Sequence, residues 1–181
     1  MMDHSNMGGM GHGMMKMNLG PADAQYDLRF IDAMNPHHKG AVEMATDALQ
    51  KSKRPEIKRL AQNIIADQNR ELKLMLQWRQ AWYPNASSKP VAYDAQMGHT
   101  MAMSKAQMQG MMNGNLGAAD AQYDLRFINM MIPHHQGAIV MAQDALNKSQ
   151  RPEIKRLAQN IITSQQREID QMKQWRTQWY S

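Results

Sequence analysis

The stretch Met-Asn-Pro-His-His-Lys-Gly-Ala-Val-Glu-Met at residues 34–44 occurs a second time, as Met-Ile-Pro-His-His-Gln-Gly-Ala-Ile-Val-Met at residues 131–141. In both copies apolar residues recur every three or four positions, which is the spacing of one face of an α-helix. Each copy also places a pair of adjacent histidines between two methionines. The repeat therefore predicts a duplicated helical unit that carries nitrogen and sulfur donors.

The helical pattern extends outward from each copy. It covers about residues 22–52 and 55–83 in the first repeat, and about 118–149 and 152–180 in the second. The joint between the helices of a repeat is very short, which predicts an antiparallel αα-hairpin. Pro36 is expected to kink its helix, because proline removes a backbone donor. Two such hairpins can bury their apolar faces against each other, so we predict an all-α four-helix bundle.

The composition between the hairpins differs from that of the helices. Residues 1–18 and 84–116 are rich in Met, His, Gly and Asn, without a helical period. We predict a flexible tail at 1–18, a first hairpin at 19–83, a flexible linker at 84–116 and a second hairpin at 117–181, with both hairpins in one bundle. Since no period places the linker methionines on one face, we expect them outside the core.

Methionine is the unusual component of the chain. There are 20 Met and 7 His but no Cys among 181 residues, so thiolate sites and disulfides are excluded. Thioethers can serve soft metals in an oxidising compartment, where cysteines would form disulfides. The net charge is +5, and the basic residues alternate with acidic ones along the helices. The absence of a concentrated basic stripe argues against nucleic-acid binding. No apolar run has transmembrane length, and we expect any export signal to have been removed already.

The paired histidines lie at helical spacing from methionines. Thioethers select Cu(I), and imidazole suits copper in either oxidation state. Folding the hairpin back on itself sets His37 and His38 level with Gln68, one turn from Glu71, and the second repeat sets Gln165 and Glu168 likewise. These polar groups are expected to orient the imidazoles. We predict two copper sites, with the ligands Met34, His37, His38 and Met44 in the first repeat and Met130, Met131, His134, His135 and Met141 in the second.

The two copies differ close to the histidines. Asp32, Ala33 and Glu43 are replaced by Asn129, Met130 and Val140. The second site is less acidic and richer in sulfur, so it is expected to prefer Cu(I) or Ag(I) over harder ions more strongly than the first.

The tail and linker offer further donors on short arcs of chain. Three thioether or imidazole groups on such an arc suffice for trigonal Cu(I). The candidates are Met7, Met10, His12, Met14, Met15 and Met17 in the tail, and Met97, His99, Met101, Met103, Met108, Met111 and Met112 in the linker. If Met2 is the mature N-terminus, its amine and His4 form a further site for Cu(II). The alternative for both segments is a low-complexity spacer.

For single methionines and histidines, the alternative to metal ligation is ordinary packing in the core. Met75 and Met172 are expected in the core, and the four tryptophans are expected to anchor the bundle. The adjacent histidines could themselves be core residues with hydrogen-bond partners, but leucine would pack better there, so we favour metal ligation.

The motif Asp-Leu-Arg-Phe-Ile…Pro-His-His…Gly-Ala, followed by Arg-Pro-Glu-Ile-Lys-Arg-Leu-Ala-Gln, occurs in both repeats with small changes. It resembles a bacterial family of domains of unknown function with a ferritin-like helical fold. The tandem copy with Met-rich spacers is similar to periplasmic copper-binding metallochaperones of cyanobacteria. The resemblance implies copper binding, copper resistance, and a periplasmic or extracellular location. The family's ligands correspond here to Met34, His37, His38, Met44, Met131, His134, His135 and Met141.

We therefore expect a non-catalytic protein that sequesters Cu(I) and passes it on, with Ag(I) as a mimic and Cu(II) as a further ligand. Its partners would be copper ions and copper donor or acceptor proteins of an export system, with no nucleic acid and no membrane span. A cuprous oxidase is one alternative, whereas a di-iron enzyme is disfavoured because no Glu-x-x-His motif occurs. A metal-free helical interaction module is the other alternative.

Overall fold

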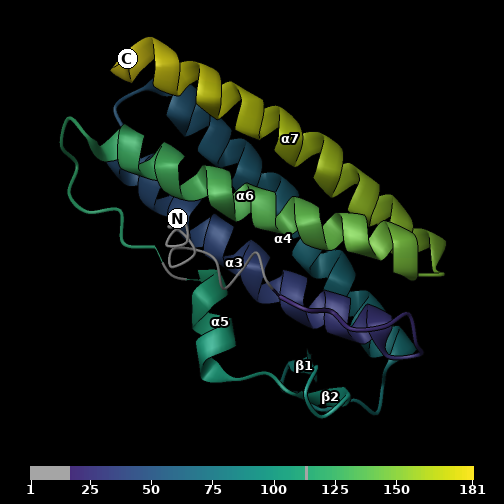
Figure 1. The fold of residues 1–181 in the computed structure, drawn as a ribbon. Helices are drawn as coiled ribbons and strands as arrows, with labels where there is room; N and C mark the ends of the chain where they lie inside the picture. The colour runs from purple at the N-terminus through teal and green to yellow at the C-terminus, as the bar shows by residue number, and fades with distance from the viewer. Residues whose placement is uncertain (1–16, 113) are drawn as a thin grey trace, which may run out of the picture.

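A computed structural model describes residues 17–112 and 114–181 of the chain. The described residues include four long helices, and their axes are closely aligned (Figure 1). These helices are α3 (Tyr26–Lys51), α4 (Pro55–Trp82), α6 (Tyr123–Lys148) and α7 (Pro152–Tyr180). Between α4 and α6 lie β1 (Val91–Asp94), β2 (His99–Ala102) and the short helix α5 (Lys105–Met112). The all-α four-helix bundle expected from the repeat is thus confirmed.

The ends of the helices follow from local chemistry. Pro55 occupies the first turn of α4, where its missing N–H costs nothing. Helix α3 begins later than periodicity predicts, at Tyr26, because the Asp23 carboxylate accepts a hydrogen bond from the Gln25 N–H at 3.0 Å and forms a turn there. Pro36 lies inside α3, which continues through it.

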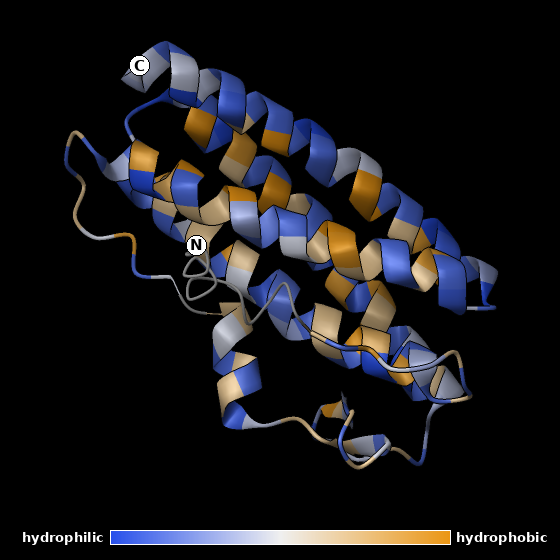
Figure 2. Cartoon of the chain, viewed as in Figure 1, coloured by the Kyte–Doolittle hydropathy of each residue, from blue (hydrophilic) through white to orange (hydrophobic). Residues whose placement is uncertain are grey.

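The long helices pack as α3 against α4, α6 against α7, and α3 against α6. Apolar and polar residues alternate in short blocks along each of them (Figure 2), as expected when one face is buried and the other is wet. Two apolar clusters fill the interior, one containing Phe30, Met34 and Met141, the other containing Phe127, Met44 and Met131. No helix in the described part of the chain is long and apolar enough to cross a membrane.

Reciprocal contacts join the two repeats. The Tyr26 hydroxyl donates to Asp144 at 2.7 Å, and the Tyr123 hydroxyl donates to Asp47 at 2.6 Å. Matching ion pairs link Arg54 to Asp124 at 2.8 Å and Arg151 to Asp27 at 2.7 Å. Since each of these four contacts has its equivalent in the other repeat, α3 and α6 are related by an approximate two-fold axis that passes between them.

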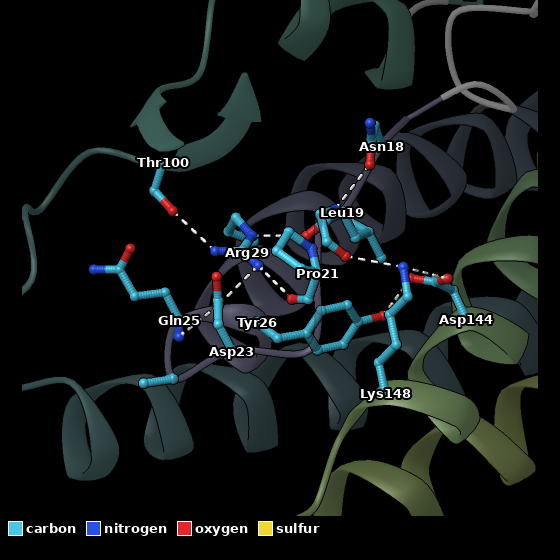
Figure 3. Close-up of polar contacts among 12 residues, drawn as sticks. Asn18, Leu19, Pro21, Asp23, Gln25, Tyr26, Arg29, Thr100, Asp144 and Lys148 are labelled. Atoms are coloured by element: carbon cyan, nitrogen blue, oxygen red, sulfur yellow. Dashed lines mark hydrogen bonds and ion pairs between the residues drawn. The ribbon is translucent and has the colours of Figure 1, made fainter. Parts of the chain in front are cut away.

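A buried arginine fastens the segment before α3 to the bundle (Figure 3). Arg29 is 1% exposed. Its guanidinium donates to the Leu19 carbonyl at 2.7 Å, the Pro21 carbonyl at 2.8 Å and the Thr100 hydroxyl at 2.9 Å. Charged donors make the stronger hydrogen bonds, so Arg29 fixes residues 19–21 and strand β2 in relation to α3.

The linker is more regular than the sequence predicts. Strands β1 and β2 form an antiparallel pair from Val91 opposite Ala102 to Asp94 opposite His99, and α5 packs against α3. Met103 and Met111 are 8% and 1% exposed, so the expectation that linker methionines stay outside the core is wrong for these two. The reason is that α5 and its preceding turn cover an apolar part of α3 that the four long helices leave open.

Candidate metal centre

The four helical histidines meet between α3 and α6. Each of His37, His38, His134 and His135 is at most 2% exposed. The rings of His37 and His134 stack with their centroids 3.8 Å apart and their planes 27° from parallel. The approximate two-fold axis thus brings the two histidine pairs, which the sequence treats as separate sites, to one level of the bundle.

Glutamates on the outer helices hold one histidine of each pair. The Nε2 atom of His38 lies 2.6 Å from a carboxylate oxygen of Glu71, and that of His135 lies 2.6 Å from Glu168. Because a carboxylate accepts, each Nε2 donates the hydrogen bond, and each Nδ1 has no partner among the described residues. The hairpin register predicts this contact of a histidine with Glu71.

A backbone carbonyl holds a third histidine. The Nε2 of His134 lies 3.1 Å from the Met111 carbonyl at the end of α5. This carbonyl accepts the proton of Nε2, which leaves the lone pair on Nδ1. Sequence reasoning missed Met111 as an orienting group. The one available signal was the glycine retained in both copies, Gly40 and Gly137, because a Cβ on Gly40 would lie 2.4 Å from that carbonyl oxygen.

Each histidine presents a buried nitrogen without a hydrogen-bond partner among the described residues. These atoms are His37 Nε2, His38 Nδ1, His134 Nδ1 and His135 Nδ1. An unsatisfied buried polar atom costs about 1–3 kcal/mol, so four of them in one place need an explanation. A soft metal ion that accepts the lone pairs supplies one.

Burial keeps the rings of His37 and His134 neutral. It lowers the pKa of His37 well below its ordinary value, and the neighbouring His134 lowers it further. Burial also lowers the pKa of His134 to about 3, against a smaller opposing effect of the Met111 carbonyl. At neutral pH both imidazoles are therefore unprotonated, which is the form that binds metals.

The methionines that flank a histidine pair in the sequence separate in the fold. Met34 and Met44 are ten positions apart, or about 15 Å along a helix axis. Met34 shares its apolar cluster with Met141 and Met75, whereas Met44 shares the other cluster with Met131 and Met172. Methionines are thus grouped across the repeats, with Met75 and Met172 fully buried.

Other sequence candidates lie apart from this centre or beyond the described residues. The side-chain oxygens of Gln68 and Gln165 are buried and have no hydrogen-bond partner among the described residues. The linker residues Met97, His99 and Met101 are exposed, while Met108 and Met112 are partly buried. Met17 packs against the Phe30 cluster. The predicted donors Met2, His4, Met7, Met10, His12, Met14 and Met15 fall outside the described residues.

Imidazole nitrogens and thioethers are the donors that this fold offers. In residues 17–112 and 114–181, no three His, Asp or Glu side chains lie where they could jointly hold one ion. Any ion at the centre would therefore use a pair of imidazole nitrogens or add sulfur, and low coordination numbers with such donors are typical of monovalent copper and silver.

Two hollows between α4 and α7 lead toward the centre. One has a volume of about 500 Å³ and is lined by Glu71, Trp78 and Arg167, among others. The second has a volume of about 320 Å³ and is lined by Glu168 and Trp175. The carboxylates that hold His38 and His135 are thus reached from the surface through these hollows.

A duplicated four-helix bundle with a buried histidine centre describes this molecule. The family described as a domain of unknown function, DUF305, matches residues 27–176, and the chain belongs to this family.

Solved structures of the protein CopM are similar over most of their length. CopM in the Cu(I)-bound form is 41% identical, covering 86% of this chain and 98% of CopM, with a TM-score of 0.68. The Cu(II)-bound form gives 46% identity, coverage of 85% and 97%, and a TM-score of 0.69. A silver-bound form is 39% identical, covering 86% of this chain and 98% of CopM, with a TM-score of 0.68. The metals expected from the sequence are thus those carried by the CopM structures.

A curated relative is the uncharacterized protein L153 of Acanthamoeba polyphaga mimivirus. It is 49% identical over 49 residues, and the match spans 27% of this chain but only 32% of the relative. It indicates shared ancestry of a segment and carries no functional information.

Proposed function

We propose that this protein is a non-catalytic copper carrier, which binds Cu(I) at the histidine centre, sequesters it, and passes it to other proteins. The observation that carries the proposal is the set of four buried imidazole nitrogens without partners. Burial keeps the rings of His37 and His134 neutral by lowering their pKa values, and three of the four rings are oriented by Glu71, Glu168 or the Met111 carbonyl. Similarity to CopM, whose structures contain Cu(I), silver and Cu(II), supports the same choice of metal.

Each element has a part in this function. Burial of the histidines excludes water, which slows oxidation of Cu(I). The buried Glu71 and Glu168 line the hollows between α4 and α7, where an ion would enter and leave. The exposed methionines of the linker, with those of the tail, would capture ions from a donor or present them to an acceptor of an export system.

We place this carrier in the periplasm or the extracellular space, where it would contribute to copper resistance. The chain has 20 methionines and no cysteine, a combination that provides soft ligands under oxidising conditions. Deleting the gene in its own host should lower growth in elevated copper, and restoring it without the histidine centre should not reverse the defect. Equal growth of the deletion strain would contradict the resistance role.

The binding proposal is tested with a variant in which His37, His38, His134 and His135 are all alanine. Anaerobic competition for Cu(I) against bicinchoninate should show loss of the tightest binding, at least 100-fold in affinity, with helical content by circular dichroism largely retained. The control is His99→Ala, because His99 is an exposed linker histidine. Unchanged tight binding in the quadruple variant would refute the site. If that variant fails to fold, the pairwise variants His37→Ala/His38→Ala and His134→Ala/His135→Ala give the same test.

A further inference from the structure

One of the four paired histidines differs from the other three. His38, His134 and His135 each use Nε2 in a hydrogen bond and leave Nδ1 without a partner among the described residues. In His37 it is Nε2 that has no partner there. The two-fold relation makes His37 the equivalent of His134, whose Nε2 lies 3.1 Å from the Met111 carbonyl. Among the described residues, His37 therefore lacks the equivalent of that carbonyl.

The sequence identifies the equivalent residue. The alignment that pairs His37 with His134 also pairs Met14 with Met111. The tripeptide Gly-Met-Met precedes both repeats, at residues 13–15 and 110–112. In the second repeat this tripeptide is the end of α5 and delivers the carbonyl to the histidine. In the first repeat it is the end of the N-terminal tail, and it lies outside the described residues.

The two segments follow the same path up to the edge of the described residues. The side chains of Asn18 and Asn115 each accept a hydrogen bond from the N–H of the glycine two positions on, at 2.8 and 3.0 Å. Those glycines have φ angles of 81° and 79°, which glycine adopts readily. On both sides a leucine carbonyl accepts from an arginine of the following helix at 2.7 Å, in the pairs Leu19 with Arg29 and Leu116 with Arg126. An equal number of residues separates Asn18 from Met14 and Asn115 from Met111.

A glycine on α6 matches the one that admits α5 to α3. A Cβ on Gly40 would lie 2.4 Å from the Met111 carbonyl oxygen, so only glycine permits that approach. Gly137 is the equivalent residue of α6, and it is buried within the helix. Glycine inside a helix is destabilising relative to alanine. A second close approach of backbone, this time beside Gly137, explains why the glycine is kept there.

We propose that the N-terminal tail docks beside α6 through residues 13–16, and that the Met14 carbonyl accepts a hydrogen bond from His37 Nε2. By the same equivalence the Met14 side chain is buried, as that of Met111 is. With Nε2 engaged, the nitrogen of His37 left for an ion is Nδ1, as in the other three histidines. Met14 is thus a positioning residue that acts through its backbone. Its effect on the metal rests on the proposed function, whereas the contact itself is made in the metal-free protein.

The first test reads the ring of His37 by NMR in the metal-free, ¹⁵N-labelled protein. The wild type should show a slowly exchanging Nε2–H on His37, in the same tautomer as His134. Met14→Asp places a charge where an apolar side chain is buried, so it should abolish that signal and leave the one of His134. Ser5→Asp is the matched control, because it adds the same charge outside residues 13–16 and should change neither ring. An unchanged His37 signal in Met14→Asp would overturn the proposal.

Trypsin gives a second readout on the whole protein, because Lys16 is the first lysine or arginine of the chain and belongs to the docked segment. Gly137→Ala should displace this segment and speed cleavage after Lys16 roughly tenfold, since proteolysis follows the population of the open form. The mirror variant Gly40→Ala displaces α5 instead, so its cleavage rate after Lys16 should equal that of the wild type. Equal rates in all three proteins would contradict docking beside Gly137.

Dilution shows which chain supplies the segment. A tail of the same chain protects Lys16 equally at every protein concentration. Protection that is lost on dilution would mean that a second copy supplies the segment, and would overturn the assignment. Cu(I) competition separates this inference from the proposed function. A wild type that binds no Cu(I) but shows the Nε2–H of His37 would refute the carrier and still support the docked tail.

Discussion

At the scale of single residues, the properties of the centre come from buried imidazoles that hydrogen-bond acceptors hold in place. His38 and His135 each donate to a glutamate at 2.6 Å, which fixes the tautomer and raises the basicity of the opposite nitrogen. The pattern of a buried ring with one hydrogen-bonded nitrogen, and one nitrogen without a partner among the described residues, occurs on both sides of the two-fold axis. The glutamates are therefore positioning residues for metal binding.

The variant Glu71→Ala/Glu168→Ala should weaken Cu(I) binding by about 10- to 100-fold, the range found when such outer partners are removed. Glu71→Gln/Glu168→Gln should recover part of this loss, because the amide oxygen still accepts a hydrogen bond. The measurement is anaerobic competition for Cu(I), with the exposed Glu43→Ala as control. Equal affinity in the alanine variant and the wild type would show that these carboxylates only support the fold.

The stability of the metal-free protein should fall in acid. The folded-state pKa of His134 is about 3, whereas that of an unfolded histidine is about 6.5. Between these values the unfolded chain binds a proton at this position and the folded chain does not, so the free energy of unfolding decreases as the pH falls from about 6.5 toward 3.

Urea unfolding at pH 7.5 and 4.5 measures this effect, with His134→Gln as the comparison. The variant should lose less stability between the two pH values than the wild type, because it lacks the neutral buried imidazole. An equal or larger loss in the variant would mean that His134 is protonated in the folded state.

At the scale of elements, the linker completes the centre. The β-hairpin is tied to the bundle because Asp32 accepts from Arg79 at 2.6 and 2.8 Å and from the Val91 N–H at 2.9 Å. Helix α5 then delivers the Met111 carbonyl to His134. The Met-rich composition concealed this helix, because α5 has eight residues and one buried methionine, Met111, and is too short to show a periodic pattern. The hairpin helices, by contrast, were predictable because their apolar periodicity runs through many turns.

Close approach of α5 depends on a single missing side chain. Gly40→Ala would set a Cβ 2.4 Å from the Met111 carbonyl oxygen and 3.0 Å from the Met112 Cα. These are backbone atoms, so α5 must shift, and the expected loss of stability is about 1–3 kcal/mol. Gly110→Ala is the matched control, because nothing lies within 4 Å of its Cβ position and helix propensity favours alanine by up to about 1 kcal/mol. Chemical denaturation of both variants makes the comparison. Equal stability of Gly40→Ala and the wild type would show that the contact of α5 contributes little.

At the scale of the whole molecule, the two-fold relation between the repeats brings both histidine pairs into one centre. The duplication predicts four helices, and the short joint predicts the contact of His38 with Glu71. Neither predicts that His37 stacks on His134, because sequence does not say which faces of two separate hairpins meet. For the same reason, the sequence does not predict that Met34 lies in one apolar cluster with Met141. The helix rise alone, however, shows that Met34 and Met44 are too far apart to share an ion.

The central claim is that the histidine centre, between α3 and α6, is where a monovalent copper ion binds most tightly. It is tested most directly by anomalous diffraction at the copper edge from crystals grown anaerobically with one equivalent of Cu(I). The account predicts the strongest anomalous peak within bonding distance of imidazole nitrogens of the paired histidines. A strongest peak elsewhere, with all four imidazoles contacting only protein atoms, would contradict it.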